Sequence, residues 1–305
     1  MRVSVIVPTF NSARFLCEAI GSVHAQTYKD FEIIIVDDGS TDDTLNVVKQ
    51  LDKPCKYFYQ TNAGPSVARN YGISESNGEF VAFLDADDAW LPSKLETQIR
   101  LFDRHPEVGA VETASYLCDE TLKPLKFLPP ARLRGHVFQD MLLKSKVPST
   151  STMIVRRKCL KLVGGFDARY RNVQDYDLWL RLAQVCQYDY LEEGFAYQRV
   201  HSNRSLKNGR YMLEAYKHIV QKHLSNFPEL NSRMGDAFFR AEKSALKLMC
   251  VNHQSRDACT LLKQCLNTYP LRRSILISLY LALLLIPQRW VFGVRKLYWH
   301  FASGY

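Results

Sequence analysis

The stretch FVAFLDADDAW, from Phe80 to Trp90, decides most of what this 305-residue sequence predicts. Its first half is an apolar run, and its second half carries the carboxylates Asp85, Asp87 and Asp88. A short unbroken apolar run is typical of a strand that helices cover on both faces of a parallel sheet. Ligands of such sheets bind beyond the carboxyl ends of the strands. The stretch therefore predicts a buried strand that ends at an acidic binding site.

Similar apolar runs occur before and after this stretch, and amphipathic segments separate them. We expect strands at Val3–Val7, Phe31–Val36, Cys55–Tyr59, Phe80–Leu84 and Met153–Val155. Helices are expected after Asn11, from Ser40 and Thr41, at Pro65, from Pro92 and Ser93, over Tyr176–Val185 and over about 211–266. Alternating strands and helices imply right-handed crossovers, so residues 1–205 are expected to form an α/β domain with a mainly parallel central sheet flanked by helices. Residues 113–150, which contain four prolines, are expected to be irregular.

Two further polar clusters follow strands of this expected sheet. Thr9-Phe10-Asn11 comes after the first strand and Asp37-Asp38-Gly39-Ser40 after the second. Because parallel strands end at one edge, both clusters should converge on the same cleft as the acidic stretch. Carboxylates there can accept the N–H of a nucleoside base or a ribose hydroxyl. The alternative is that they only cap helices.

The Asp85-Ala86-Asp87-Asp88 cluster suits the binding of a nucleotide diphosphate. A divalent cation held by carboxylates neutralises the charge of a diphosphate leaving group, and Mg²⁺ or Mn²⁺ takes carboxylate and phosphate oxygens. A lone pair of aspartates two residues apart is a weak signal. Its alternative explanation is N-capping of the helix near Pro92.

Two later segments carry the remaining candidates. In QDYDLWLR, from Gln174 to Arg181, Asp175 at a helix start is a candidate general base, with Trp179 as an apolar shelf. The alternative is that Asp175 only caps that helix. In YQRVH, from Tyr197 to His201, Arg199 and His201 point the same way if the chain is extended, toward a diphosphate or metal. An ordinary structural histidine is the alternative.

Taken together, these segments resemble glycosyltransferase family 2, whose members have the GT-A fold. The matching pieces appear in the family's order within residues 1–205: VSVIVPTFN, IIIVDDGSTDDT, NAGPSVARNYGI, FVAFLDADDAW, GGFD and QDYDLWLRL. Each piece is a weak signal alone, whereas the ordered set is highly specific. Residues 206–305 are not covered by this resemblance and are expected to form a helical extension.

The resemblance implies a role for each matching position. Thr9, Phe10, Asp37, Asp38 and Arg69 would contact the donor nucleotide, together with Asp85. A metal and the diphosphate would be held by Asp85, Asp87, Asp88 and His201, with Mn²⁺ or Mg²⁺ as the cofactor. Asp175 would be the catalytic base, and Gln174 and Trp179 would lie on the acceptor side. The family usually has Glu where this chain has Gln174, and an amide cannot act as a base but can still hydrogen-bond an acceptor.

The last third of the chain is strongly basic. From residue 206 onward there are 15 Lys and Arg against 5 Asp and Glu, a net charge of +10, whereas residues 1–205 carry −1. No zinc-finger or RNA-binding signature accompanies this charge, so no nucleic acid is expected. The uncharged run Ser274–Ile286 would span about 20 Å as a helix, too short for the ~30 Å core of a bilayer. With its basic and aromatic flanks, segment 272–301 favours contact with an anionic membrane surface; a buried helix is the alternative.

These observations predict an inverting transferase that moves one sugar from a nucleotide-diphosphate sugar to a hydroxyl of a glycan or lipid-linked acceptor, and the analogy with the family favours a UDP-sugar as the donor. By analogy with the family, we expect a role in cell-surface polysaccharide biosynthesis. No signal-peptide pattern precedes the first strand, so we expect a cytoplasmic protein at the inner face of the cell membrane. Two alternatives remain: a sugar nucleotidyltransferase, and a non-catalytic sugar-nucleotide binder.

Overall fold

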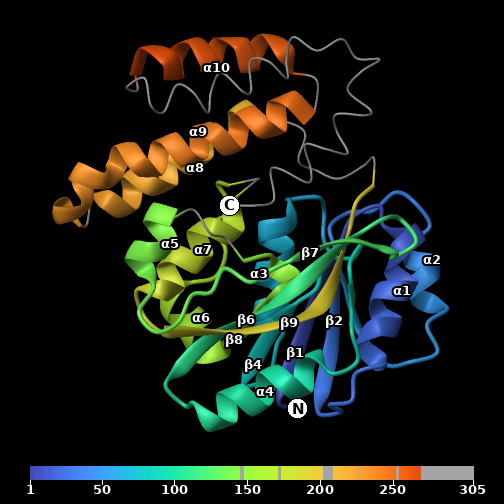
Figure 1. The fold of residues 1–305 in the computed structure, drawn as a ribbon. Coiled ribbons are helices and arrows are strands. Elements are labelled where there is room, and N and C mark those ends of the chain that lie inside the picture. The colour runs from blue at the N-terminus through green and yellow to red at the C-terminus, as the bar shows by residue number, and fades with distance from the viewer. Residues whose placement is uncertain (145–147, 171–172, 202–208, 226, 252–253, 269–305) are drawn as a thin grey trace. The chain divides into compact units, whose positions relative to one another are not determined.

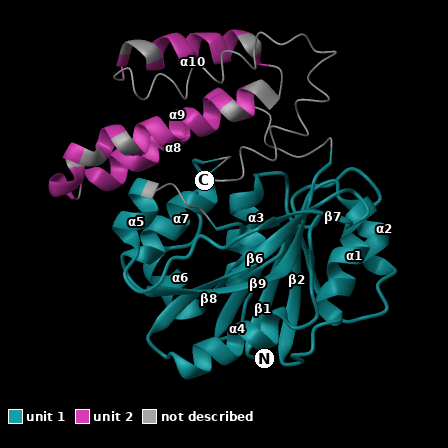
Figure 2. Cartoon of the chain, in the orientation of Figure 1, with its two compact units in different colours: residues 1–204 teal, residues 205–305 magenta. Residues whose placement is uncertain are grey.

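The computed structural model describes residues 1–144, 148–170, 173–201, 209–225, 227–251 and 254–268. The chain divides into two compact units, Met1–Arg204 and Ser205–Tyr305 (Figure 2). Segment 272–301, which the sequence analysis assigns to a membrane surface, lies outside the described residues.

In the described residues, unit 1 is built around one nine-stranded sheet with helices packed around it (Figure 1). The order is β3-β2-β1-β4-β8-β6-β9-β5, and β7 pairs with β6. The strands are β1 Val3–Thr9, β2 Phe31–Asp37, β3 Lys56–Tyr59, β4 Phe80–Phe83, β5 Ala89–Trp90, β6 Val108–Cys118, β7 Pro124–Leu128, β8 Ile154–Arg156 and β9 Gln187–Arg199.

The half of the sheet formed by β3, β2, β1 and β4 is parallel, as predicted. Thr9 lies opposite Asp37, and Asp37 lies opposite Tyr59, so these strands end at the same edge. Beyond β4 the sheet is mixed: β8 is antiparallel to β4 and β6, β9 is parallel to β6, and β5 is antiparallel to β9. The edge at which the parallel strands end carries the polar clusters.

The helices of unit 1 mostly begin where the sequence predicts. They are α1 Ala13–His24, α2 Thr44–Lys49, α3 Pro65–Ser74, α4 Lys94–Arg104, α5 Phe138–Lys144, α6 Arg157–Val163, α7 Gln174–Ala183 and the 3₁₀ turn η1 Thr150–Thr152. Pro65 occupies the first turn of α3, and Ser93 immediately precedes α4. The helix expected from Ser40 begins later, at Thr44.

The expectation that residues 113–150 are irregular is wrong. This segment contains most of β6, all of β7, and α5. Pro124 is the first residue of β7, a position where its missing N–H costs no ladder hydrogen bond. Buried polar side chains, including Glu112, Thr113 and Ser115, interrupt the apolar pattern of β6. The sequence pattern therefore does not predict a strand there.

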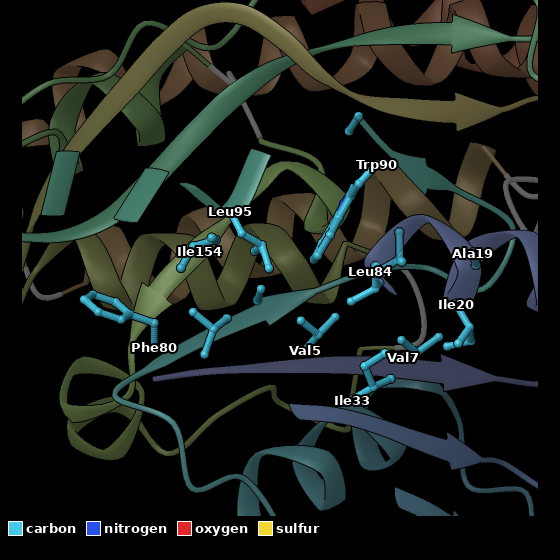
Figure 3. Close-up of a cluster of buried hydrophobic side chains, with 14 of the residues drawn as sticks. Val5, Val7, Ala19, Ile20, Ile33, Phe80, Leu84, Trp90, Leu95 and Ile154 are labelled. Carbon is cyan, nitrogen blue, oxygen red and sulfur yellow. The ribbon is translucent and has the colours of Figure 1, made fainter. Parts of the chain in front are cut away.

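Figure 3 shows the core cluster that supports the acidic stretch. Leu84, Ala86 and Trp90 belong to this cluster, together with Val5 of β1 and Leu95 of α4. The indole Nε1 of Trp90 donates a 2.8 Å hydrogen bond to the Ser151 carbonyl oxygen. The apolar residues that alternate with the aspartates therefore anchor the acidic turn in the core.

Unit 2 is helical in its described part. Its elements are α8 Gly209–Leu224, the 3₁₀ segment η2 Pro228–Arg233, α9 Met234–Val251 and α10 Ser255–Thr268. Lys217 of α8 and Glu242 of α9 form a 2.5 Å ion pair, and Leu213, Ile219 and Leu246 are buried between the helices. Among the helices the structure describes, none is both long enough and apolar enough to cross a bilayer.

Two helical glycines provide a matched test of how α3 packs on β1. A Cβ at Gly72 of α3 would overlap the buried side chain of Ile6, whereas a Cβ at Gly21 of α1 would meet nothing within 4 Å. We expect Gly72→Ala to lower the free energy of unfolding by about 1–3 kcal/mol because of overpacking. Gly21→Ala should raise it by about 0.5–1 kcal/mol, since alanine favours a helix. Urea unfolding measures both, and equal effects of the same sign would refute the described packing.

Candidate active site

Three carboxylates converge in the turn between β4 and β5. One oxygen from each of Asp85, Asp87 and Asp88 lies within 4.8 Å of the others. Asp88 is buried and accepts hydrogen bonds from the Ser151 hydroxyl (2.6 Å) and the Arg199 N–H (3.0 Å), while Asp85 and Asp87 are partly exposed. The residue that precedes α4 is Ser93, so these aspartates do not cap that helix.

Basic side chains surround this acidic turn. Arg69 Nη2 lies 2.6 Å from an Asp85 oxygen, and His201 Nε2 lies 2.8 Å from an Asp87 oxygen. Arg199 is almost fully buried and donates from Nε to the Asp87 carbonyl oxygen at 2.8 Å. His201 and Arg199 thus both reach the turn from the end of β9, although Arg199 contacts its backbone and is not open to a ligand.

Several buried polar atoms near this edge have no hydrogen-bond partner within the described residues. They are Nε and Nη1 of Arg69, Oγ1 of Thr9 and Oε1 of Gln174. An unpaired buried donor or acceptor costs about 1–3 kcal/mol, so native proteins rarely leave one without a reason. Arg69 therefore offers two free N–H groups beside Asp85, as an anion-binding group would.

Asp37 and Asp38 are buried and hold the surrounding loops. Asp37 accepts hydrogen bonds from the Ser40 N–H and the Tyr57 hydroxyl, both at 2.8 Å. Asp38 accepts from Gln60 Nε2 at 2.7 Å and from the N–H groups of Ala63 and Gly64 at 2.8 Å. Asp38 therefore fixes the loop that begins α3, the helix that carries Arg69. In contrast, Phe10 is 49% exposed at the same edge.

Asp175 stands at the first turn of α7. Val173 before it adopts a left-handed conformation (φ 56°), and an Asp175 oxygen accepts a 2.8 Å hydrogen bond from the Tyr176 N–H. Burial raises the pKa of Asp175, and the Asp85 carboxylate raises it further, while the Tyr176 N–H and the Arg69 guanidinium lower it. The charges of both Asp85 and Arg69 therefore act on the Asp175 carboxyl. Gln174, the first residue of α7, lies beside Asp175.

The expectation that Trp179 contacts an acceptor is not supported. Its side chain is fully buried, and its Nε1 donates a 3.0 Å hydrogen bond to the Pro148 carbonyl oxygen. Its ring packs against Phe83 and Phe166, with centroid separations of 6.3 and 6.4 Å. Trp179 therefore anchors α7 in the core, and it positions Asp175 only through that helix.

Two residues of the site were missed in the sequence. The Thr150 hydroxyl donates to an Asp85 oxygen at 3.1 Å, and the Ser151 hydroxyl links Asp88 with the Asp85 N–H. Both lie in η1: Thr150 is the last residue of the segment expected to be irregular, and Ser151 directly follows that segment. The run of four hydroxyl residues from Ser149 to Thr152 is the only signal in the sequence that could have drawn attention to them.

Comparison with known proteins is consistent with this site. Residues 4–162 match the family model described as glycosyl transferase family 2. An uncharacterised glycosyltransferase of Rickettsia typhi is 34% identical over 70% of this chain and 69% of its own length. An uncharacterised glycosyltransferase of Nostoc is 36% identical over 66% of this chain and 65% of its own length. The chain spans only 35% of a longer relative from Rickettsia conorii, which is 32% identical over 67% of this chain.

Solved structures of glycosyltransferases share the fold. The mannosyltransferase PcManGT from Pyrobaculum calidifontis, in complex with GDP-Man and Mn²⁺, aligns with a TM-score of 0.60 at 20% identity over 97% of this chain and 84% of that one. S. aureus TarS, in complex with UDP-GlcNAc, aligns with a TM-score of 0.58 at 20% identity over 81% of each chain. At this identity the likeness establishes the fold alone. The sheet order, the acidic turn and the family match together identify the chain as a glycosyltransferase that belongs to family 2 and has the GT-A fold.

Proposed function

We propose that this glycosyltransferase transfers one sugar from a UDP-sugar, with inversion, to a hydroxyl of a glycan or lipid-linked acceptor during cell-surface polysaccharide biosynthesis. The observation that carries the proposal is the grouping of Asp85, Arg69 and Asp175. It combines a carboxylate turn for a metal, a cation with free N–H groups for a phosphate, and a carboxylate of raised pKa for a proton. A single-sugar transfer requires these three functions.

The acidic turn suits a divalent cation. Mn²⁺ and Mg²⁺ prefer oxygen ligands and commonly take one or two carboxylates together with phosphate oxygens. Asp85 and Asp87 would hold the ion, since they are partly exposed, while Asp88 is engaged by Ser151 and Arg199. When bound, such a cation neutralises negative charge that develops on a diphosphate leaving group.

Arg69 would bind the donor phosphates through Nε and Nη1, while Nη2 stays on Asp85. Thr9 and Phe10, at the end of β1, would lie along the nucleoside. We propose an indirect role for Asp37 and Asp38, because their oxygens already accept five hydrogen bonds within the protein. They would shape the nucleotide pocket rather than supply most of its contacts.

Asp175 would act as the general base. Its carboxylate would take the proton of the acceptor hydroxyl while that oxygen attacks the anomeric carbon from the side opposite the diphosphate, which inverts the configuration. A raised pKa makes a carboxylate a stronger base near neutral pH. Gln174 Oε1, which lacks a partner, would accept a hydrogen bond from another hydroxyl of the acceptor.

The two alternative functions differ in their products. A nucleotidyltransferase would want a glycine-rich phosphate loop after β1, where this chain has Pro8-Thr9-Phe10-Asn11, and it would release pyrophosphate. A non-catalytic binder would release nothing. A donor screen that measures nucleoside diphosphate release, with Mn²⁺ and with EDTA, tests the proposal. Release that requires the metal supports a transferase, whereas pyrophosphate or no product from any donor contradicts it.

Asp175→Asn tests the base. We expect kcat to fall by about 10²–10⁴-fold, the usual contribution of general base catalysis. The Kd for UDP with Mn²⁺, measured by calorimetry, should stay close to that of the wild type. Asp52→Asn, an exposed aspartate before β3 at the opposite edge of the sheet, serves as the control. Loss of UDP binding in Asp175→Asn would contradict the assignment.

The pH profile tests the coupling between Arg69 and Asp175. Transfer requires ionised Asp175, so kcat should fall as the pH drops through its raised pKa. Because the Arg69 charge lowers that pKa, Arg69→Gln should move the acid limb to higher pH. Arg100→Gln, which removes an exposed arginine of α4, should leave the limb in place. If the acid limb of Arg69→Gln stays in place or moves to lower pH, the Arg69 charge does not lower the pKa of the catalytic base.

Asp87→Ala tests the metal site. Loss of one carboxylate should raise the Mn²⁺ concentration needed for half-maximal UDP binding by about 10–100-fold, as loss of supporting groups in metal sites does. The readout is UDP binding titrated with Mn²⁺, with Asp52→Ala as control. The same Mn²⁺ dependence in the variant and the wild type would rule out Asp87 as a ligand.

We also propose that the basic, apolar segment 272–301 attaches the protein to anionic membrane. Five positive residues border its uncharged run: Arg272, Arg273, Arg289, Arg295 and Lys296. Each basic residue close to an anionic surface contributes about 1 kcal/mol. Deletion of residues 272–305 should abolish co-sedimentation with phosphatidylglycerol vesicles at low salt. Retention after deletion, or equal binding to phosphatidylcholine vesicles, would argue against this attachment.

A further inference from the structure

Three aromatic side chains lie side by side on one face of the sheet, and we call them the aromatic row: Phe127 of β7, Tyr116 of β6 and Tyr197 of β9. Tyr116 is directly opposite both Phe127 and Tyr197 in the strand register, so all three share a face. The ring centroid of Tyr116 lies 5.5 Å from that of Phe127 and 5.7 Å from that of Tyr197. A Cβ on Gly194 would approach the Tyr116 ring to 2.5 Å, so this glycine leaves room for the ring.

The aromatic row is open to solvent on its β7 side. Phe127 is 44% exposed, and Leu125, two residues earlier in β7, is 60% exposed. Within the described sheet, β7 pairs with β6 alone and is therefore an edge strand. The hydroxyls of Tyr116 and Tyr197 have no hydrogen-bond partner among the described residues and are not buried. Exposed apolar side chains gathered on an edge strand indicate a binding surface.

The aromatic row is continuous with the acidic turn. Tyr197 pairs with Ala89, the residue directly after Asp88. Arg199, two residues farther along the same face of β9, donates to the Asp87 carbonyl oxygen. The row therefore ends one residue pair away from the turn to which we assign the metal.

The turn of the β6–β7 hairpin lies next to the same arginine, Arg199. Glu120, in the turn between β6 and β7, pairs with Arg14 of α1 at 2.6 Å. The carbonyl oxygen of Glu120 also accepts a hydrogen bond from Arg199. The hairpin that carries Tyr116 and Phe127 is thus fastened to α1, which follows the exposed Phe10.

We propose that the aromatic row binds the glycan of the acceptor, at sugars that precede the one receiving the new residue. Aromatic rings offer flat apolar faces for the C–H surfaces of pyranose rings, and tyrosine hydroxyls add hydrogen bonds to sugar hydroxyls. A row of three rings spans more than one sugar, so it selects an oligosaccharide. This inference rests on the proposed function, because it takes the acidic turn as the place where transfer occurs.

The test measures glycan binding separately from donor binding. Labelled wild-type protein, loaded with UDP and Mn²⁺, is applied to an array of defined bacterial surface glycans from monosaccharides to octasaccharides. Retention should appear on at least one glycan series and increase with chain length. Phe127→Ala should lower it about tenfold, the scale expected for one aromatic contact. The matched control Leu162→Ala removes a 72% exposed leucine of α6 and should change nothing.

The other possible results distinguish failure of the inferred acceptor site from failure of the proposed function. If wild-type protein binds UDP with Mn²⁺ but no glycan on the array, the aromatic row is not an acceptor site, and the proposed function stands. If it binds no nucleotide of a donor panel, the proposed function itself fails. Equal losses in Phe127→Ala and Leu162→Ala would also overturn the inference. So would a wild-type dimer in solution that Phe127→Ala converts to a monomer, because the surface would then bind a second copy.

Discussion

Crowding of negative charge at the end of β4 is the constraint on which the site depends. Three carboxylates that offer oxygens within 4.8 Å of one another repel strongly unless cations or donors surround them. The fold supplies Arg69 from α3, and His201 and the buried Arg199 from the end of β9, and it adds the hydroxyls of Thr150 and Ser151. Asp88 is satisfied by this shell, whereas Asp85 and Asp87 stay partly open. This is the arrangement on which we base the proposed metal site at the turn and the proposed phosphate contact of Arg69.

The rest of unit 1 places these groups accurately. Asp38 fixes the loop that begins α3 and therefore the position of Arg69, and Trp179 fixes α7 and therefore the position of Asp175. Both residues act through buried hydrogen bonds within the protein. A group held in this way needs no rearrangement when charge develops during the reaction, which is the main source of electrostatic catalysis. The charge of Asp85 raises the pKa of Asp175 and the charge of Arg69 lowers it, so the basicity of Asp175 depends on both residues.

The sequence predicts the parallel half of the fold and the edge at which the polar clusters meet, because local patterns encode both. Apolar runs identify β1, β2, β3 and β4, and the polar residues that follow β1, β2 and β4 must meet at one edge. The long strands β6 and β9 escaped prediction, because buried polar residues such as Glu112, Thr113 and Gln198 break their apolar pattern. Thr150, Ser151 and the aromatic row were not predicted either, because their positions depend on contacts between segments that are distant in the sequence. Trp179 was misjudged because periodicity shows that a helix has an apolar face but not which residues reach the deepest core.

Anomalous scattering from crystals grown with Mn²⁺ and UDP tests the central claim most directly, since it locates the metal without an acceptor. The account predicts one strong manganese peak within about 2–2.5 Å of carboxylate oxygens of Asp85 or Asp87, the usual range for oxygen ligands. The diphosphate should bridge that ion and Arg69, and Asp175 should face the open side of the β-phosphate. A manganese ion bound elsewhere, or a UDP molecule that leaves Arg69 and the acidic turn untouched, would contradict it.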